Sequence, residues 1–281
     1  MKRLCLLLIL LFGKFLFSQS FGRDSLKGDF TYLLKAKLNT KTPNYVYEEF
    51  FSLLVSDKHA FFASTPSLKK DTILENASVT TKNPDGSITL SLKKGITMPK
   101  TKFHYTIIQS NENVQYFEPV AMSVLTYKEP IINNWKLINE SKVISSMVCK
   151  KAEINYKGRN WVAWYSTEIP LPYGPYKFSG LPGLIIKITD DKEDYDFELI
   201  KSVPTSKLKG KLINIKKSRY NEAVETTQPK FEKALRNAKT DAISFLASYG
   251  TTIIKGQDII RQTMKEKEEN MKYENPLELS N

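Results

Sequence analysis

Residues 148–167, VCKKAEINYKGRNWVAWYST, carry the strongest structural signal in the sequence. Two runs rich in apolar and aromatic residues flank Lys157-Gly158, a pair suited to a two-residue turn between antiparallel strands. The segment therefore predicts a β-hairpin of residues 148–156 with 159–167. Because side chains alternate across a strand, the residues of its second strand divide into two faces. Trp161, Ala163 and Tyr165 are expected on one face, and Val162 and Trp164 on the other.

Apolar residues alternate with polar ones through much of the chain, and this period of two predicts further strands. Three more pairs of strands flank short polar turns: residues 50–55 with 60–63, 103–108 with 114–117, and 184–188 with 195–200. Single strands are predicted at 30–38, 88–92 and 212–215. The expected fold is mainly β, with an antiparallel sheet that could curl into an incomplete barrel.

A helical period begins only after Thr227, a suitable N-cap with Pro229 in the first turn. Apolar residues then recur at helical spacing as far as Tyr249, just before Gly250. This predicts one long amphipathic helix over residues 228–249 that packs on the sheet, giving an α+β arrangement. We expect a single β-rich domain over residues 21–256, followed by a charged C-terminal tail over 257–281 with a short helix around Ile259–Met271.

The N-terminus has the order of a secretory signal peptide. A basic start at Lys2-Arg3 precedes the apolar run 4–12, and small residues follow at Ser18-Gln19-Ser20. The apolar run is too short to span a bilayer, which takes about 20 residues. We therefore expect cleavage of residues 1–20 and a secreted protein, periplasmic or extracellular, that does not span the membrane.

Cleavage would also lower the charge from +12 to +9, because Lys2, Arg3 and Lys14 would leave with the peptide. The remaining lysines occur as scattered pairs rather than one patch. Without a clustered basic surface or a recognisable binding module, nucleic acid is not an expected partner.

The search for catalytic and metal-binding motifs excludes several enzyme classes. Only His59 and His104 are present, without a zinc-binding spacing, and the sequence has no nucleophile elbow, P-loop or dinucleotide fingerprint. An acidic stretch, residues 190–196, contains the densest set of oxygen ligands. It lacks the glycine and terminal glutamate of an EF-hand loop, so a solvated turn is favoured over a calcium site. No cofactor, metal site or catalytic residue is assigned.

The most specific motif is Gly180-Leu-Pro-Gly-Leu-Ile185. Pro182-Gly183 suits the two central positions of a type II turn, and Leu184 then begins a buried strand. Together with Gly158-Arg159, Glu168-Ile169-Pro170 and Asn275-Pro276-Leu277-Glu278, this hexapeptide resembles the GLPGLI family. The resemblance implies an exported, β-rich Bacteroidetes-type protein without an agreed activity or a known catalytic residue.

The loop that precedes this motif is rich in aromatic residues and proline. One interpretation is a turn that begins a core strand, with the Trp161 and Trp164 hairpin alongside. The other is an exposed lip that contacts a partner or an apolar ligand. The candidate lip consists of Tyr173, Pro175, Tyr176, Phe178, Leu181, Pro182, Trp161 and Trp164.

Three functions remain open on these grounds. The first is a non-enzymatic binding or assembly module of the cell envelope, whose partner is another envelope protein or an apolar ligand. The second is a carrier of lipid or another apolar molecule in a cavity between the curled sheet and the helix. The third is a carboxylate-dependent hydrolase, which requires two carboxylates to converge in a cleft near Arg159 or Glu168.

Cys149 is the one thiol left after cleavage. Strict alternation places it on the same side as Lys151 and Glu153, which would expose it. An exposed thiol is vulnerable in an oxidising compartment, and cysteine is among the most often buried residues. We therefore predict an irregularity in strand register near Met147–Lys150 that turns Cys149 into the core and leaves Lys150 and Lys151 outward.

Overall fold

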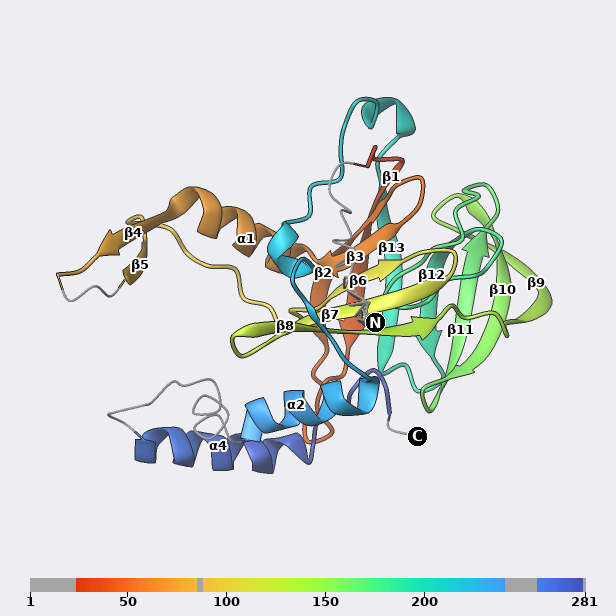
Figure 1. Ribbon diagram of the computed structural model, residues 1–281. Coiled ribbons are helices and arrows are strands. Elements are labelled where there is room, and N and C mark those ends of the chain that lie inside the picture. The colour runs from red at the N-terminus through yellow and green to blue at the C-terminus, as the bar shows by residue number, and fades with distance from the viewer. Residues whose placement is uncertain (1–23, 85–87, 241–256, 280–281) are drawn as a thin grey trace, which may run out of the picture.

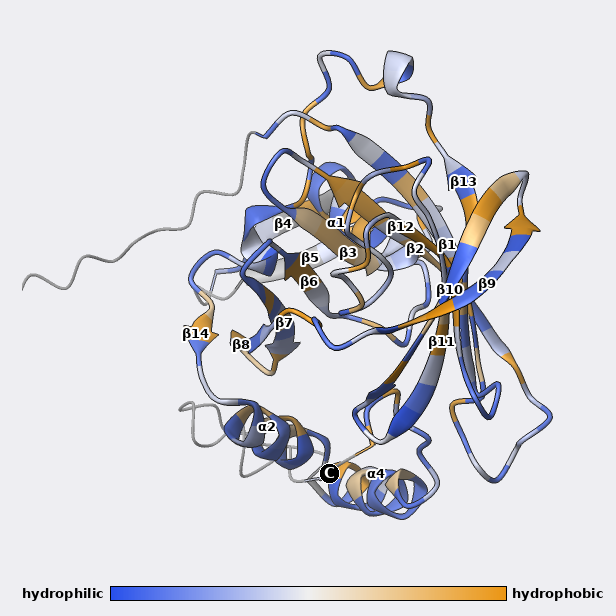
Figure 2. Cartoon of the chain, turned by 90° about the vertical axis from the view of Figure 1, so that its right-hand side faces the viewer, coloured by the Kyte–Doolittle hydropathy of each residue, from blue (hydrophilic) through white to orange (hydrophobic). Residues whose placement is uncertain are grey.

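The computed structural model describes residues 24–84, 88–240 and 257–279. Twelve strands form one large sheet in the order β14-β8-β7-β6-β3-β2-β1-β13-β12-β11-β10-β9. Neighbouring strands are antiparallel, except that β14 runs parallel to β8. The sheet is strongly curved but does not close, so β9 and β14 are its two edges (Figures 1 and 2). The expected fold, mainly β with an antiparallel sheet, is confirmed, and the sheet is curved but open.

The sheet strands are β1 Gly28–Ala36, β2 Tyr47–Val55, β3 Ala60–Ser64, β6 Thr106–Gln109, β7 Asn113–Val120, β8 Ser123–Pro130, β9 Lys136–Ile144, β10 Met147–Tyr156, β11 Arg159–Ser166, β12 Leu184–Asp190, β13 Tyr195–Ser202 and β14 Val224–Glu225. A separate hairpin consists of β4 Ser78–Lys82 and β5 Ile88–Leu92. The helices are α1 Thr65–Ala77, α2 Gln228–Thr240 and α4 Gln257–Met271, with short 3-10 turns at Thr205–Lys207 and Lys217–Arg219.

All four predicted hairpins are present. The turn between β10 and β11 has positive φ at both Lys157 (50°) and Gly158 (77°), the backbone of a type I′ turn. Residues 212–215 do not form a strand, and the main-chain pairing there is a single bridge between Ser25 and Leu212. This segment instead packs Ile213 and Ile215 on the outer face of the sheet.

The C-terminal part contains two described helices instead of one long helix. The first half of the predicted helix 228–249 is α2, and residues 241–249 lie outside the described residues. α4 occupies the start of the expected charged tail, at the site of the predicted short helix, and packs against α2 (Figure 1). Hydrophilic residues dominate the visible faces of both helices (Figure 2). α2 contacts β7 and β8, and the two helices lie at one end of the sheet (Figure 1).

α1 was not expected, because its apolar residues show no helical period. Its start nevertheless carries a local signal. The side chain of Ser64 accepts a hydrogen bond from the amide of Ser67 at 3.1 Å, as an N-cap serine does, and Pro66 follows two residues later. α1 leads to the β4–β5 hairpin, which projects away from the main sheet (Figure 1).

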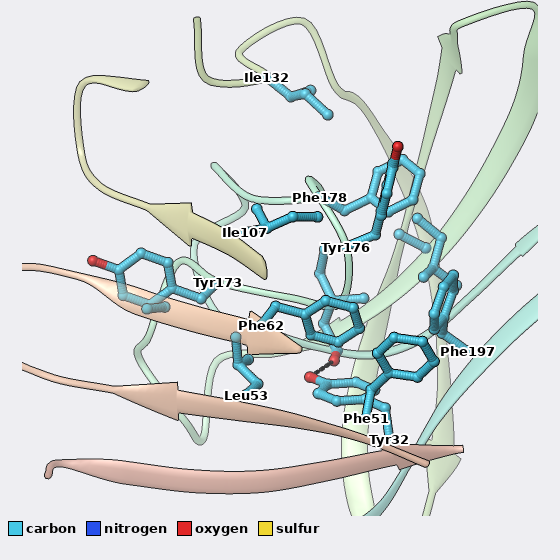
Figure 3. Packing of buried hydrophobic residues seen from close by; sticks show 14 of the residues in the cluster. Tyr32, Phe51, Leu53, Phe62, Ile107, Ile132, Tyr173, Tyr176, Phe178 and Phe197 are labelled. Carbon is cyan, nitrogen blue, oxygen red and sulfur yellow. Dashed lines mark hydrogen bonds between the residues drawn. The ribbon is translucent and has the colours of Figure 1, made fainter. Parts of the chain in front are cut away.

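The main core lies inside the curve of the sheet. Phe51 stacks on Phe62 at 4.9 Å, and Phe197 meets both rings edge-on at 6.1 Å. Tyr32 donates a hydrogen bond from its hydroxyl group to the carbonyl of Ile185 at 2.6 Å (Figure 3). This interior is filled by side chains from both halves of the sheet.

The predicted burial of Cys149 through an irregularity in strand register is confirmed. Its side chain is fully buried, and the pairing of β10 with β9 shifts register between Lys150 and Lys151. Lys150 is exposed, while Lys151 is half-buried and pairs with Glu140 at 3.1 Å. The irregularity therefore lies at the end of the predicted interval.

None of the helices among the described residues has the length and apolar character needed to cross a membrane.

Candidate functional site

A cavity of about 810 Å³ opens where the curved sheet meets α2 and the C-terminal segment. Most of its wall comes from the residues before β6, from β7 and β8, from the loop between β11 and β12, from α2 and from residues 270–279. The residues after β1, the β10–β11 turn and the start of β13 complete it. Aromatic rings form much of the wall: Phe103, Tyr105, Tyr116, Tyr127, Tyr176, Tyr195 and Phe231. Cavities of this size are typical of small-molecule sites.

Strands β7 and β8 each place a tyrosine and a glutamate two residues apart, Tyr116 with Glu118 and Tyr127 with Glu129. Residues at this spacing share one face of a strand. Tyr116 and Tyr127 are cross-strand partners, and their rings stack at 5.2 Å. Because the strands are antiparallel, the two glutamates follow this tyrosine pair in opposite directions. Phe231 of α2 packs against both tyrosine rings, at 5.5 and 5.1 Å.

Lys177 lies on the Glu129 side of the tyrosine pair and is only 1% exposed. Its ammonium group donates hydrogen bonds to the Tyr127 hydroxyl at 2.9 Å, Glu129 at 2.6 Å and Glu278 at 2.5 Å. The rings of Tyr116, Tyr127 and Tyr176 lie 4.9–5.4 Å from the same nitrogen. We call Lys177, Tyr127, Glu129 and Glu278 the lysine cluster.

The charges within the lysine cluster compensate one another. Burial alone would raise the pKa of Glu129, but the ammonium groups of Lys177 and Lys157 outweigh this effect and hold its pKa below the ordinary value. Lys157 pairs with Glu129 at 2.7 Å. Glu278 also accepts a hydrogen bond from the hydroxyl group of Tyr176 at 2.8 Å. Each carboxylate in the lysine cluster therefore already has a cationic partner.

Arg159 holds the C-terminal segment in place. Its buried guanidinium group pairs with Asp190 at 2.7 Å and donates to the carbonyls of Pro276 and Leu277 at 2.8 and 3.1 Å. The side chain of Asn275 accepts a further bond from the same guanidinium group at 2.5 Å. This contact positions Glu278 over Lys177.

Glu118, on the other side of the tyrosine pair, has a different environment. Its carboxylate accepts a hydrogen bond from the Tyr116 hydroxyl at 2.8 Å. Within the described part of the chain, no lysine, arginine or histidine lies within ion-pairing distance of it. Burial raises the pKa of Glu118, and the hydrogen bond from Tyr116 and the more distant charge of Lys239 only partly offset this.

Tyr105 lies beside Glu118 in the cavity wall. Its ring contacts those of Tyr116 at 5.3 Å and Phe103 at 5.8 Å, and the residue is 5% exposed. Its buried hydroxyl has no hydrogen-bond partner among the described residues. We call Tyr105, Tyr116 and Glu118 the open cluster. It combines a carboxylate, aromatic rings in the cavity wall, and a buried hydroxyl without a partner among the described residues.

The expected exposed lip does not form. Pro182 is exposed, but Tyr173, Pro175, Tyr176, Phe178 and Leu181 are buried, as are Trp161 and Trp164. The loop turns into the curved sheet, where Phe178 packs against Trp161 at 4.7 Å (Figure 3 shows Tyr176 and Phe178 inside the core). A composition rich in aromatic residues and proline suits both a surface loop and an internal loop. Here the curvature of the sheet makes the loop internal. Of the predicted lip residues, Tyr176 alone lines the cavity.

The Gly-Leu-Pro-Gly-Leu-Ile segment uses its glycines differently from the expected type II turn. Gly180, not Gly183, has positive φ, at 87°. A side chain on Gly180 would overlap the carbonyl oxygen of Ile132, and one on Gly183 would overlap that of Ser166. Both glycines thus allow the loop to pack directly against neighbouring main chain.

The carboxylates considered for hydrolysis lie elsewhere. Asp190 pairs with Arg159 and accepts the amides of Asp194 and Tyr195 at 2.8 Å each, so it closes the β12–β13 turn. The tip of this turn, residues 191–193, is exposed, as expected of a solvated turn. Glu168 accepts the amide of Val148 at 2.8 Å. No group of residues in the described ranges is arranged to bind a metal ion.

Sequence reasoning missed Lys177, Glu118, Glu129, Tyr105 and Glu278. A signal was available in the Tyr-x-Glu pattern of two successive strands, at 116–118 and 127–129. The motif search tested catalytic spacings along one segment, whereas this site combines segments that are far apart in sequence.

Comparison with known proteins gives a local match and a fold match. Residues 155–187, which contain β11 and the Gly180–Ile185 segment, match a family described as "Protein of unknown function (Porph_ging)". The match covers a small part of the chain, so the GLPGLI family remains a resemblance. A comparison with curated protein sequences gave no match.

Two crystal structures of PNGF-II, in space groups P21 and C2, have a similar fold. Each superposes with a TM-score of 0.50, at 12% and 11% sequence identity, over 76% and 75% of this chain. The aligned region spans about a third of the PNGF-II chain, 34% and 33%. At this identity the similarity concerns the fold alone.

Proposed function

We propose that this chain is an exported, non-enzymatic binding module whose ligand occupies the cavity beside α2. The observation that carries the proposal is the open cluster. Glu118, a carboxylate without a cationic partner among the described residues, and Tyr105, whose buried hydroxyl has no hydrogen-bond partner among them, both line a cavity with aromatic walls. Buried polar groups usually have partners in the folded chain, so an exception in a cavity wall supports a partner supplied by a ligand.

The binding surface in this proposal differs from the one expected at first. The loop between β11 and β12 contributes its Tyr176 ring to the cavity wall, while the rest of the loop supports that wall from behind. Gln109 fixes the loop by donating to the carbonyls of Gly174 and Tyr176, at 3.0 and 2.5 Å. The loop is therefore a rigid support for the binding cavity.

A lipid carrier has less support. The cavity does lie between the sheet and α2, where a carrier would need it. However, the interior of the curved sheet is filled by Phe51, Phe62, Phe197 and their neighbours, and charged residues line the cavity. A long acyl chain requires a continuous apolar space.

A hydrolase also has less support. The raised pKa of Glu118 suits a general acid. A second carboxylate would have to act as base or nucleophile, and Glu278, which also lines the cavity, is held by Lys177 and Tyr176. A binding function accounts for Glu118 and Tyr105 without requiring a second free carboxylate.

The proposal is tested by blocking the cavity. Leu235 of α2 lines it, whereas Asn237 on the same helix is exposed and does not. Saturation-transfer NMR with small aromatic alcohols, amines and acids is expected to detect binding to the wild type and to Asn237→Trp, and none to Leu235→Trp. Binding that survives Leu235→Trp, or no binding of any compound to the wild type, would refute the proposal.

A further inference from the structure

We propose that the ligand carries a single protonated amine, which binds the open cluster, next to an aromatic or aliphatic group that packs on the cavity wall. This inference rests on the proposed function and names its class of ligand. It is carried by the correspondence between the open cluster and the lysine cluster on the two sides of the same tyrosine pair.

The lysine cluster shows how this fold binds an ammonium group. Lys177 receives two carboxylates, one tyrosine hydroxyl and the rings of three tyrosines. Ammonium groups are attracted both by carboxylates and by the electron-rich faces of aromatic rings. Tyr116 is one of these three rings, and its hydroxyl binds Glu118 on the opposite side.

The open cluster offers the same types of group to the cavity. Glu118 supplies a carboxylate, and Tyr105, whose buried hydroxyl has no partner among the described residues, lines the same wall. The ring of Tyr116 lies 5.3 Å from that of Tyr105 and 5.5 Å from that of Phe231. The nearest basic residue to consider is Lys239, which pairs with Glu274 at 3.4 Å. An amine from a ligand is the chemical group that would neutralise Glu118 and use the rings at the same time.

The other carboxylates that line the cavity are already engaged or exposed. Glu278 binds Lys177, Glu274 pairs with Lys239, and Glu232 is an exposed acceptor for Gln228. Glu118 is therefore the position where a ligand cation gains most, because an interaction strengthens as both groups leave water.

The remaining wall describes the rest of the ligand. Leu38, Phe103, Leu235 and Leu277 form apolar parts of the cavity wall. Lys102 and Arg236, both exposed at the cavity, would repel a second positive charge. The expected ligand is thus singly charged and has a sizeable carbon skeleton, unlike a polyamine or a metal ion.

Three probes with one phenol skeleton test the charge of the ligand. They are tyramine, an amine; tyrosol, its neutral alcohol; and 3-(4-hydroxyphenyl)propionate, an anion. Calorimetric titration of the full chain is expected to give at least about tenfold tighter binding for tyramine than for tyrosol, and the weakest binding for the anion. A charge-assisted hydrogen bond is of sufficient strength for such a difference.

Variants then locate the amine. Glu118→Gln should bring tyramine to the affinity of tyrosol, while Tyr105→Phe should weaken both probes. Glu112→Gln, an exposed substitution at the β6–β7 turn, should change neither. Far-ultraviolet circular dichroism verifies that each variant is folded.

The possible results separate this inference from the proposed function. Equal affinity for tyramine and tyrosol, with binding abolished by Leu235→Trp, would leave the cavity as a binding site and refute the amine. A preference for tyramine that persists in Glu118→Gln would also refute it, because the amine would then bind elsewhere. No binding of any probe or of the wider compound set would refute both proposals.

Discussion

Glu118 and Glu129 occupy matching places in the fold but have opposite electrostatic environments. Each follows a tyrosine by two residues on neighbouring strands, and the two tyrosines stack on each other. Glu129 meets two lysines, and its pKa is lowered in spite of its burial. Glu118 meets none at ion-pairing distance among the described residues, and burial raises its pKa. The difference comes from segments outside the two strands.

Two such segments reach Glu129 and not Glu118. The loop between β11 and β12 delivers Lys177, and the turn between β10 and β11 delivers Lys157. A strand pattern thus determines where a carboxylate lies, and the long-range partner determines what it does. On this account the lysine cluster stabilises the fold, while the proposed binding capacity of the open cluster comes at some expense of stability.

The largest expected effect comes from removing Lys177. Lys177→Met leaves Glu129 and Glu278 buried without their shared cation, so the free energy of unfolding should fall by about 3–5 kcal/mol. Urea denaturation at neutral pH measures the change. Lys209→Met, at an exposed position, is the matched control and should have almost no effect. A loss below about 1 kcal/mol for Lys177→Met would show that the lysine cluster does not stabilise the fold.

A substitution at Gly180 tests the packing of the β11–β12 loop, which holds Lys177 in the lysine cluster. Alanine there must adopt a positive φ and displace the carbonyl of Ile132, which should cost about 2–4 kcal/mol. Gly210→Ala also has positive φ, but no atom lies within 4 Å of the added carbon, so it should cost about 1 kcal/mol. Equal losses in urea denaturation would contradict the close packing of the loop.

The open cluster should respond in the opposite direction. Glu118→Gln removes a half-buried charge that has no ionic partner among the described residues, and the free energy of unfolding at about pH 7 should rise by about 1 kcal/mol. The corresponding Glu129→Gln should lower it, because Lys177 and Lys157 lose an ionic partner. If both variants are destabilised alike, the contrast between the two glutamates is wrong.

The pH dependence of stability gives a smaller effect with a definite sign. The folded pKa of Glu118 lies above its unfolded value near 4.5, so the folded state binds the proton more tightly. The contribution of Glu118 to stability therefore declines as the pH rises from the unfolded pKa through the folded pKa. The excess in free energy of unfolding of Glu118→Gln over the wild type should therefore shrink as the pH is lowered from about 7 to about 4. For Glu129, whose folded pKa is lowered, the stabilising contribution is present above the unfolded value and is lost as pH falls through the folded one.

Local sequence patterns predicted much of the sheet. The Lys157-Gly158 turn, the alternation of the flanking strands and the burial of Cys149 all depend on neighbouring residues and general compartment chemistry, and each was found. α1 was missed because its apolar residues have no helical period, although Ser64 and Pro66 mark its start.

The site could not be predicted in the same way, because it is assembled over long sequence separations. Glu278 meets Lys177 across 101 residues, and Lys177 meets Glu129 across 48. The aromatic loop was expected at the surface, and only the curvature of the whole sheet decides that it turns inward. A pattern of Tyr-x-Glu could indicate the two carboxylates, but not which of them a lysine neutralises.

The most direct test of this account is a carboxyl ¹³C NMR titration of Glu118 and Glu129, with and without tyramine. The account predicts a pKa above the ordinary glutamate value for Glu118 and below it for Glu129, and a decrease at Glu118 alone when tyramine is added. Glu118→Gln and Glu129→Gln assign the two signals. Ordinary pKa values for both residues, or a Glu118 titration that tyramine leaves unchanged, would contradict the claim that the open cluster is a binding site for an amine.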